Sequence, residues 1–444
     1  MNMRSQPLLS TVRDTLAGYL TDTTRVRLGL SGGLDSVALL HLLSCLQGER
    51  AFKLSAMHVH HGLSMDADAW AAHCQALCLQ YGVPCEVVRV AVDRQHHQGL
   101  EGAARLERYR ALLAPGADVL VTAHHQDDQA ETVLLALLRG GRMRALAAMP
   151  GVRGRAEMGH LRPLLGVPRS GLEAYARAHY LTWVDDESNM DPSFRRNALR
   201  QAVFPVLESH FPDYRGRLAA AAASFGEVAG LLDQLAEGDA RFNAAGGLSC
   251  DRLAELDEAR ARNLLAWFIR RAGVPVPPPR RLREALRQLG GAAPQSQPSI
   301  RLQSASLRRY RQHIHVVPDI PAMANARWIW RGEPTLSLTG SPLRLRFEAT
   351  LGHGLSQAKL AGQAVSVRLR QGGEHLALRA GGPARSLKNL FQEAGVPPWW
   401  RGLWPLLWVG ATLVAVPGVG VHPDWQARAG ETGLRIVAEE EAVQ

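Results

Sequence analysis

The stretch Val26-Arg27-Leu28-Gly29-Leu30-Ser31-Gly32-Gly33-Leu34-Asp35-Ser36, continued by Val37-Ala38-Leu39-Leu40-His41-Leu42-Leu43, decides the fold of the N-terminal part of the chain. Its alternating apolar residues predict a buried strand, its glycines and serines a turn, and the apolar run after them a helix. Gly32 and Gly33 let the backbone bend tightly and approach a ligand closely, because neither carries a Cβ atom. Unpaired N–H groups at the start of a helix favour an anion, so the turn predicts a phosphate site. Ser31 and Ser36 add hydroxyl groups to it.

The turn contains no lysine, so it is not the Walker-type phosphate loop, which requires one. It resembles the Ser-Gly-Gly-x-Asp-Ser loop of the PP-loop ATP pyrophosphatases, enzymes that split ATP into AMP and pyrophosphate. This resemblance implies that ATP is bound by Ser31, Gly32, Gly33, Leu34, Asp35 and Ser36. One interpretation of Asp35 is an acid well placed in a first helical turn. An acid beside phosphates repels them unless a cation lies between, so we expect Asp35 to bind Mg²⁺.

Length and composition limit the class of protein. A chain of 444 residues is too long for one ordinary core, so two or three domains are expected. Hydrophobic residues make up 46% of it without a run of membrane-spanning length, which predicts a soluble protein that does not enter a membrane. The first residues do not form the apolar core of a signal peptide. Five cysteines without a Cys-x-x-Cys pair indicate reduced thiols in the cytoplasm and argue against a cysteine metal site.

The charge balance favours a polyanionic partner. Lysine and arginine number 51 against 41 acidic residues, which gives a net charge of +10. Nearly all of the basic residues are arginines, and genomic base composition explains that preference. It does not explain the excess of positive charge, so nucleic acid is the favoured partner.

Strands alternate with helices over the first 140 residues. The expected strands cover residues 26–30, 51–60, 84–92 and 117–122, and the expected helices 34–46, 66–81, 100–113 and 126–139. This order predicts the α/β fold class with a parallel sheet covered on both faces, whose ligands bind beyond the carboxyl ends of the strands. His60, His61, His124 and His125 fall at those ends. A histidine there either finds a local partner or faces the nucleotide, and His60 is the candidate for the nucleotide.

An acidic segment follows the second histidine pair. Asp127 and Asp128 are placed to cap the helix that begins there. Asp128 and Glu131 also share one face of it, one turn apart. Carboxylates gathered beside a phosphate site require a cation, either Mg²⁺ or an amine substrate. The sequence therefore favours a functional role for these acids over capping alone.

Arg105 and Arg108 lie on the expected helix over residues 100–113. Arg105 is a helix neighbour of Glu101, so one interpretation is a surface ion pair. The other places Arg105 or Arg108 where negative charge develops as pyrophosphate leaves.

Taken together, the motifs resemble those of the tRNA(Ile)-lysidine synthetases. The resemblance extends in order over most of the chain and rests on residues 31–36, 58–63, 101–109, 122–132, 186–189, 196–200, 386–393 and 396–401. Two departures stand out. His60 replaces an asparagine that many members carry, and Arg139-Gly140-Gly141-Arg142 replaces the usual Arg-Gly-Ser-Gly.

The resemblance implies a reaction and its participants. In an isoleucine tRNA with a CAU anticodon, the C2 oxygen of the first anticodon cytidine attacks the α-phosphorus of ATP. The amine of free L-lysine then displaces AMP and forms lysidine. The catalytic residues implied are Asp35, Arg105, His125, Asp128 and Glu131, with His124 or His125 as proton acceptor. The tRNA-binding candidates are Arg196, Arg200, Arg368, Arg370, Lys388 and Arg401. A solvated basic face is the alternative for Arg196 and Arg200.

The predicted architecture is a PP-loop adenylation domain over residues 1–213, a mostly helical tRNA-substrate domain over 214–325, and a small α+β tRNA-binding domain over 335–444. Three alternatives stay open. A tRNA thiolase generally uses paired cysteines, whereas Cys74 and Cys78 look like a packed helix face. The other two are a small-molecule amide synthetase and a non-catalytic RNA-binding protein. Oligomeric state is not fixed by the sequence, and a homodimer is one option.

Overall fold

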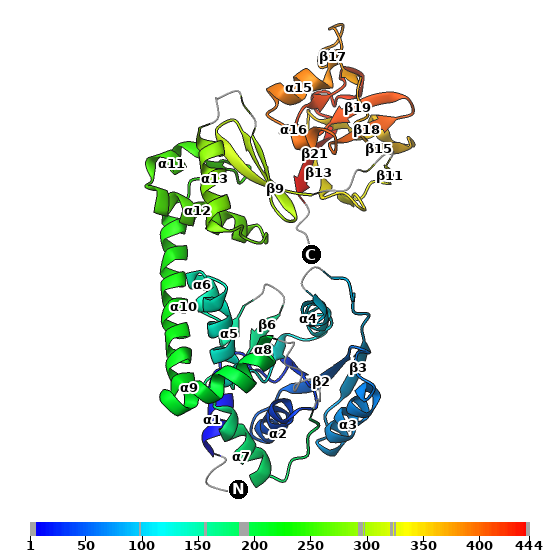
Figure 1. Cartoon of the computed structure of the whole chain (residues 1–444). Helices are drawn as coiled ribbons and strands as arrows, with labels where there is room; N and C mark the ends of the chain where they lie inside the picture. Colours follow the sequence, from blue (N-terminus) through cyan, green and yellow to red (C-terminus); the bar gives the residue numbers. More distant parts are fainter. Residues whose placement is uncertain are drawn as a thin grey trace. The chain divides into compact units, whose positions relative to one another are not determined.

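The computed structural model describes residues 6–96, 99–154, 158–185, 195–291, 296, 298–319, 323 and 326–440. The chain divides into two compact units, Met1–Gln234 and Leu235–Gln444. The division falls inside the long helix α10 (Tyr214–Asp239), drawn in green in Figure 1, and not at the expected boundary before residue 214. The three-domain boundaries therefore stay a prediction.

The first unit is built on a six-stranded sheet in the order β3-β2-β1-β4-β6-β5. All neighbouring strands are parallel except the edge pair β5 and β6. The parallel α/β sheet expected from the sequence is confirmed. The strands are β1 (Arg25–Gly29), β2 (Lys53–His60), β3 (Cys85–Arg89), β4 (Val119–Val121), β5 (Val152–Arg153) and β6 (Gly159–Leu161).

Helix α2 (Leu34–Glu49) fixes the phosphate loop from behind. It is mostly apolar, and four successive residues, Val37–Leu40, which together point to all sides of a helix, are completely buried. Such a helix is stable only when neighbours surround it, and α1 and α7 pack against α2. The start of α2 is therefore held in place by the core. The other helices of this part are α1 (Gln6–Leu16), α3 (Ala67–Gln80), α4 (Gly99–Leu112), α5 (Gln126–Leu138), α6 (Met143–Leu146) and α7 (Arg169–Ala178).

The structure confirms that Cys74 and Cys78 belong to a packed helix face. Both side chains are completely buried in the core cluster that also contains Leu77.

After the last strand of the sheet, a short helical stretch leads into α10. It consists of α8 (Arg195–Ala198), the π-helical turn η2 (Leu199–Val203) and α9 (Phe204–His210).

The middle of the chain is mostly helical, as expected. The segment around residues 253–272 forms two helices because Asp257 caps the second, its Oδ1 atom accepting the N–H of Arg260 at 2.9 Å. A four-stranded sheet in the order β7-β10-β9-β8 accompanies these helices. The elements are β7 (Leu248–Ser249), α11 (Cys250–Glu255), α12 (Glu258–Arg271), α13 (Pro279–Gly290), β8 (Ser299–Arg301), β9 (Ala305–Tyr310) and β10 (His313–Pro318).

The C-terminal part combines antiparallel sheets with short helices. Its hydrophobic core includes Phe391 and Trp400, and Trp399, Trp404 and Trp408 pack against that core, as expected for tryptophans of a small domain. One sheet has the order β11-β15-β18-β19-β20 and another β12-β13-β21-β14. The elements are β11 (Arg327–Trp330), β12 (Thr335–Ser337), β13 (Leu343–Leu351), β14 (Leu355–Ser356), α14 (Gln357–Leu360), β15 (Val365–Leu369), β16 (His375–Leu376), β17 (Arg385–Ser386), α15 (Leu387–Glu393), α16 (Pro398–Arg401), β18 (Pro405–Val409), β19 (Thr412–Val416), β20 (Gly420–Val421), η3 (Pro423–Trp425) and β21 (Thr432–Glu440).

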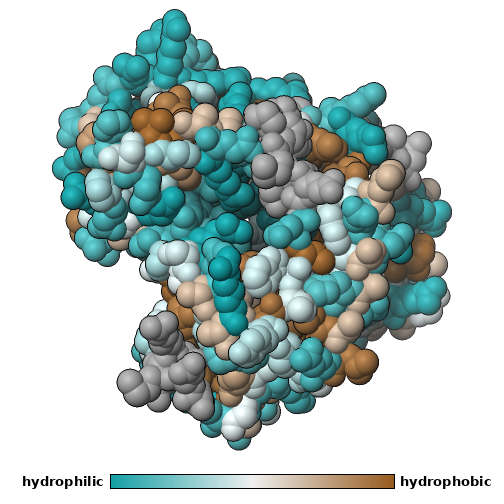
Figure 2. Space-filling view, turned by 60° about the horizontal axis from the view of Figure 1, so that its bottom comes forward, coloured by the Kyte–Doolittle hydropathy of each residue, from teal (hydrophilic) through white to brown (hydrophobic). Residues whose placement is uncertain are grey.

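Within the described ranges, none of the helices is both long and apolar enough to span a membrane. The face of the molecule seen in Figure 2 is mainly hydrophilic, and its hydrophobic residues form separate small patches.

Candidate active site

The phosphate loop between β1 and α2 is held in shape by its own serines. Ser36 Oγ accepts the N–H groups of Ser31 at 3.2 Å and Gly32 at 3.1 Å, and donates to the carbonyl oxygen of Gly33 at 3.0 Å. Gly32 has φ +87°, and a Cβ atom there would lie 3.1 Å from both Cys74 Sγ and a methyl carbon of Val184. Glycine is therefore required at this position by conformation and by space.

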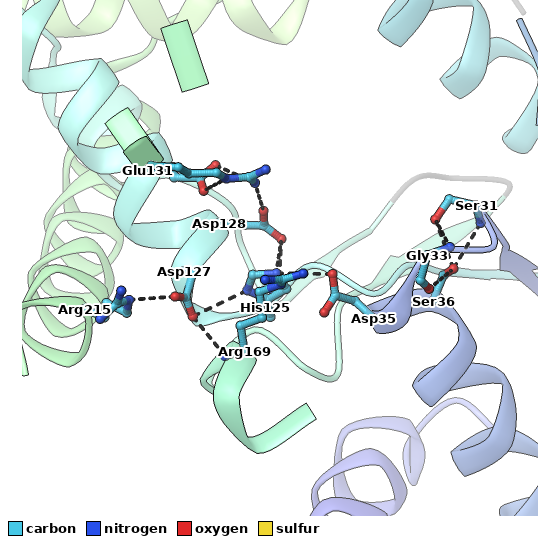
Figure 3. A network of polar contacts seen from close by, with 11 residues as sticks. Ser31, Gly33, Asp35, Ser36, His125, Asp127, Asp128, Glu131, Arg169 and Arg215 are labelled. Carbon is cyan, nitrogen blue, oxygen red and sulfur yellow. Dashed lines mark hydrogen bonds and ion pairs between the residues drawn. The ribbon is translucent and has the colours of Figure 1, made fainter. Parts of the chain in front are cut away.

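Asp35 lies in the first turn of α2 and points across the loop toward the start of α5 (Figure 3). Its Oδ2 atom is 3.5 Å from His125 Nε2. Its Oδ1 atom is buried and has no hydrogen-bond partner among the residues that the structure describes. A buried carboxylate oxygen without a donor is costly, so this atom is suited to a cation.

His125 is the centre of an acidic cluster (Figure 3). Its side chain is only 4% exposed, and its ring nitrogens lie 3.7 Å from Asp127 Oδ2 and 3.6 Å from Asp128 Oδ2, in addition to the contact with Asp35. Burial opposes a charge on the ring, but Asp127 and Asp35, helped by Asp128, outweigh it and raise the pKa of His125 to about 10. His125 therefore carries a positive charge that binds the start of α5 to Asp35.

Asp127 connects α5 to two other helices. Its Oδ2 atom accepts the N–H of Arg169 at 2.9 Å, at the start of α7, and its Oδ1 atom lies 2.6 Å from Arg215 Nε on α10. Burial opposes the charge of Asp127, but His125 and the N–H of Arg169 outweigh it and lower the pKa of the carboxyl. Asp127 is thus a structural junction. Neither Arg169 nor Arg215 could be predicted from sequence, because both are distant from Asp127 in the chain.

Glu131 lies one turn along α5 and is buried, with 1% of its side chain exposed. Arg200 of η2 binds it with two nitrogens, Nε to Oε1 and a terminal nitrogen to Oε2 at 3.1 Å, and also lies 3.5 Å from Asp128 Oδ1. Burial raises the pKa of Glu131, and the bonds from Arg200 oppose this. The structure thus gives Arg200 acidic partners beside the loop. Its contact with tRNA stays a prediction.

A second cluster is basic. It consists of Arg105, Arg108, His61 and His124, and Arg108 also interacts with Asp128. Burial and then Arg108 lower the pKa of His61 to about 4. Burial, Arg108 and Arg162 hold the pKa of His124 well below its ordinary value. The site therefore has an acidic side, formed by α5 and Asp35, and a basic side, formed by α4 and these histidines.

His60 has partners of its own. Its Nε2 atom lies 3.2 Å from Asp68 Oδ1 and 3.3 Å from a guanidinium nitrogen of Arg89, and the side chain is buried. These contacts match the interpretation of a locally satisfied histidine, and the role of His60 toward the nucleotide stays a prediction.

The predicted tRNA-binding residues have varied surroundings. Arg370 lies 3.5 Å from Glu374, Arg401 donates to the carbonyl oxygen of Val396 at 2.9 Å, and the guanidinium of Arg368 lies over the ring of Trp408. Lys388 is exposed on α15, and Arg196 is half-buried on α8. The motif at residues 186–189 lies outside the described residues.

Three family models match separate segments of the chain. Residues 6–207 match the model of the PP-loop domain, residues 248–315 that of the TilS substrate binding domain, and residues 365–438 that of the TilS substrate C-terminal domain. Among solved structures, the U34-tRNA thiolase NcsA from Methanococcus maripaludis is similar, with a TM-score of 0.44 and 19% identity over 50% of this chain and 80% of that one.

Curated relatives match over more than nine-tenths of this chain and of their own length. The tRNA(Ile)-lysidine synthase of Azoarcus sp. is 44% identical over 94% of this chain and 92% of its own length. That of Nitrosomonas europaea is 40% identical over 93% and 91%, respectively. The chain is therefore an enzyme that belongs to the tRNA(Ile)-lysidine synthase family.

Proposed function

We propose that this enzyme joins free L-lysine to C2 of the cytidine at the first anticodon position of an isoleucine tRNA with a CAU anticodon. The C2 oxygen attacks the α-phosphorus of ATP, a bond to the base forms, and pyrophosphate leaves. The side-chain amine of lysine then attacks C2 and AMP leaves. The observation that supports this proposal best is the Asp35 carboxylate, with one buried and unpaired oxygen directly beside the phosphate loop.

The unpaired Oδ1 atom of Asp35 indicates whether this site could hold Mg²⁺. In the described part of the chain, no group of three or more histidine, cysteine or acidic side chains is arranged to hold a metal. Mg²⁺ in nucleotide sites is commonly bound by one or two carboxylates together with phosphate oxygens, so Asp35 with the triphosphate is a suitable set. Mg²⁺ held there supplies positive charge against the phosphates.

The basic side of the site suits the charge of the departing pyrophosphate. Arg105 and Arg108 lie on α4 near the ends of β2 and β4, and their charges lower the pKa of His124. Positive groups already in position stabilise the negative charge that develops on phosphate oxygens. We assign this role to Arg105, with Arg108 beside it.

The acidic side suits the lysine substrate. Glu131 is 1% exposed and already bound by Arg200, whereas Asp128 is 14% exposed. Asp128 also lies 3.5 Å from Arg200, but it is the more accessible of the two acids and therefore the better candidate for the ammonium group of lysine. Glu131 supports it through Arg200.

The net charge of +10 and the family's substrate domains favour an extended contact with tRNA. Arg196, Arg368, Arg370, Lys388 and Arg401 are the proposed contributors, because positive side chains bind phosphates independently of sequence.

The experiment is incubation of the purified chain with labelled lysine, ATP and one of two transcripts, the isoleucine tRNA with a CAU anticodon or the methionine tRNA with the same anticodon. We expect ATP-dependent label on the isoleucine transcript alone. Label on neither RNA, or lysine consumed without RNA, would contradict the proposal.

A further inference from the structure

A chain of buried polar groups leads from β6 to His124, which lies three residues after the end of β4. Thr122 Oγ1 lies 2.9 Å from His124 Nδ1 and 2.8 Å from His160 Nε2. The other ring nitrogen of His160, Nδ1, lies 3.1 Å from a terminal nitrogen of Arg162. Thr122, His160 and Arg162 are each at most 6% exposed. The four residues are therefore linked by direct contacts of 2.8–3.1 Å, which we call the relay.

The direction of every hydrogen bond in this relay follows from Arg162. A guanidinium only donates hydrogen bonds, so His160 Nδ1 must be the acceptor and carries no proton. The proton of the neutral His160 ring is then on Nε2, which donates to Thr122 Oγ1. The hydroxyl group of Thr122 has one proton, and this proton is left to donate to His124 Nδ1.

The same assignment of donors and acceptors determines the tautomer of His124. Its Nδ1 atom accepts a hydrogen bond, so the proton of the neutral ring lies on Nε2. His124 is half-buried, and within the described part of the chain its Nε2 atom has no hydrogen-bond partner. The N–H group at Nε2 is thus available to a ligand.

We propose that Arg162, His160 and Thr122 are positioning residues that hold His124 as a neutral imidazole with its proton on Nε2, so that His124 donates a hydrogen bond to a phosphoryl oxygen of the bound nucleotide. The inference rests on the proposed function in one respect, namely that a nucleotide occupies the neighbouring phosphate loop. The pairing of β4 with β1 places the carboxyl ends of these two strands side by side, which brings residues 122–125 next to that loop.

The electrostatic surroundings agree with this assignment. Burial, with Arg108, Arg162 and Arg105, holds the pKa of His124 far below its ordinary value, so the ring stays neutral. Neighbouring His125 is surrounded by Asp35, Asp127 and Asp128 and has the opposite shift. The two adjacent histidines therefore differ in charge because one faces arginines and the other faces carboxylates.

The assignment also decides against one role that the sequence left open. A neutral imidazole with Nδ1 already accepting and Nε2 protonated has no free lone pair for a proton of lysine. His124 is therefore a hydrogen-bond donor in the first half of the reaction and not the proton acceptor of the second.

The test uses the full-length chain labelled with ¹⁵N in its histidines. The signals of His124 are assigned by comparison with His124→Gln, and the tautomer is read from the nitrogen shifts near neutral pH. We expect a proton on Nε2 in the wild type and in Thr122→Ser, and a mixture of tautomers in Thr122→Val. Adding inorganic pyrophosphate should shift the Nε2–H signal. Thr15→Val is the matched control, because Thr15 donates a comparable hydrogen bond to Thr11 O at 2.9 Å in a helix away from the site.

Kinetics give the second readout. In Thr122→Val the Nε2–H group of His124 is no longer held in place, so kcat of pyrophosphate release should fall about tenfold with little change in KM for ATP and tRNA. Thr122→Ser should restore kcat. A Nδ1-protonated or charged His124, an Nε2–H signal that pyrophosphate does not shift, or a Thr122→Val enzyme with wild-type kcat would each overturn the inference. The tautomer is measured without turnover, so a chain that makes no lysidine would disprove the proposed function while leaving this test intact.

Discussion

The ion pair between Glu131 and Arg200 permits a prediction with a definite size. Arg200→Met removes the charge but keeps much of the side-chain volume, and it leaves a carboxylate that is 1% exposed without its partner. Breaking a fully buried pair in this way typically costs about 3–5 kcal/mol. Because 39% of the Arg200 side chain is exposed, water screens part of the interaction, and we expect about 2–3 kcal/mol.

The size of this effect should depend on pH in a known direction. Burial already raises the pKa of Glu131, and loss of Arg200 raises it further. A carboxyl whose folded pKa lies above its unfolded value destabilises the fold increasingly as pH rises through that range. The cost of Arg200→Met should therefore be largest well above the ordinary pKa of a glutamate and should shrink as pH falls and Glu131 takes up a proton.

Urea unfolding of four proteins measures the coupling: the wild type, Arg200→Met, Glu131→Gln and the double variant. We expect the double variant to be close to Glu131→Gln, since both lack the buried Glu131 charge, and in Glu131→Gln the partly exposed Arg200 still lies 3.5 Å from Asp128 Oδ1. The reasoning is refuted if Arg200→Met lies within about 0.5 kcal/mol of the wild type, or if the two single effects simply add.

Four further predictions concern the loop, the lysine site and pH. Asp35→Asn should lower pyrophosphate release more than 100-fold (an order-of-magnitude expectation) in a chain that still folds, and near-normal turnover would remove its role. Gly32→Ala should cost about 1–2 kcal/mol in urea unfolding because its backbone has φ +87°, and a stability equal to wild type would contradict the constraint. Asp128→Asn should raise KM for lysine about tenfold or more while tRNA-dependent pyrophosphate release continues; parallel loss of both would place Asp128 in the first step. Burial lowers the pKa of His315 to about 4, so the stability that the neutral ring contributes is complete above about pH 6.5 and is lost as pH falls toward 4. His315→Gln should reduce this loss of unfolding free energy by up to about 3 kcal/mol. Parallel curves of stability against pH for the two proteins would refute the prediction.

The regular part of the fold was predictable because its signals are local. The apolar alternation of β1, the turn at Gly32 and the apolar run of α2 are adjacent in the chain, and the structure has all three. Strands β5 and β6 were not predicted, since two or three residues carry too little periodicity. They matter nonetheless, because β6 supplies His160.

The candidate site was predictable only in part, for the same physical reason. Asp35, His125 and Asp128 belong to motifs that follow strand ends, and the fold brings them together. Their partners Arg169, Arg200 and Arg215 come from distant helices, and nothing in their local sequence indicates which acid they contact. The partner of His60 is close in sequence and still could not be predicted, because the contact with Asp68 depends on how α3 packs beside β2.

The central claim is that the loop at Ser31–Ser36 activates an RNA base by transfer of AMP. The direct measurement is incubation of the chain with the CAU-bearing isoleucine transcript and ATP labelled at the α-phosphate, first without lysine and then with it. We expect label on the RNA together with released pyrophosphate in the first step, and release of that label as AMP when lysine is added. Formation of ADP, or transfer of label from the γ-phosphate to the RNA, would contradict it.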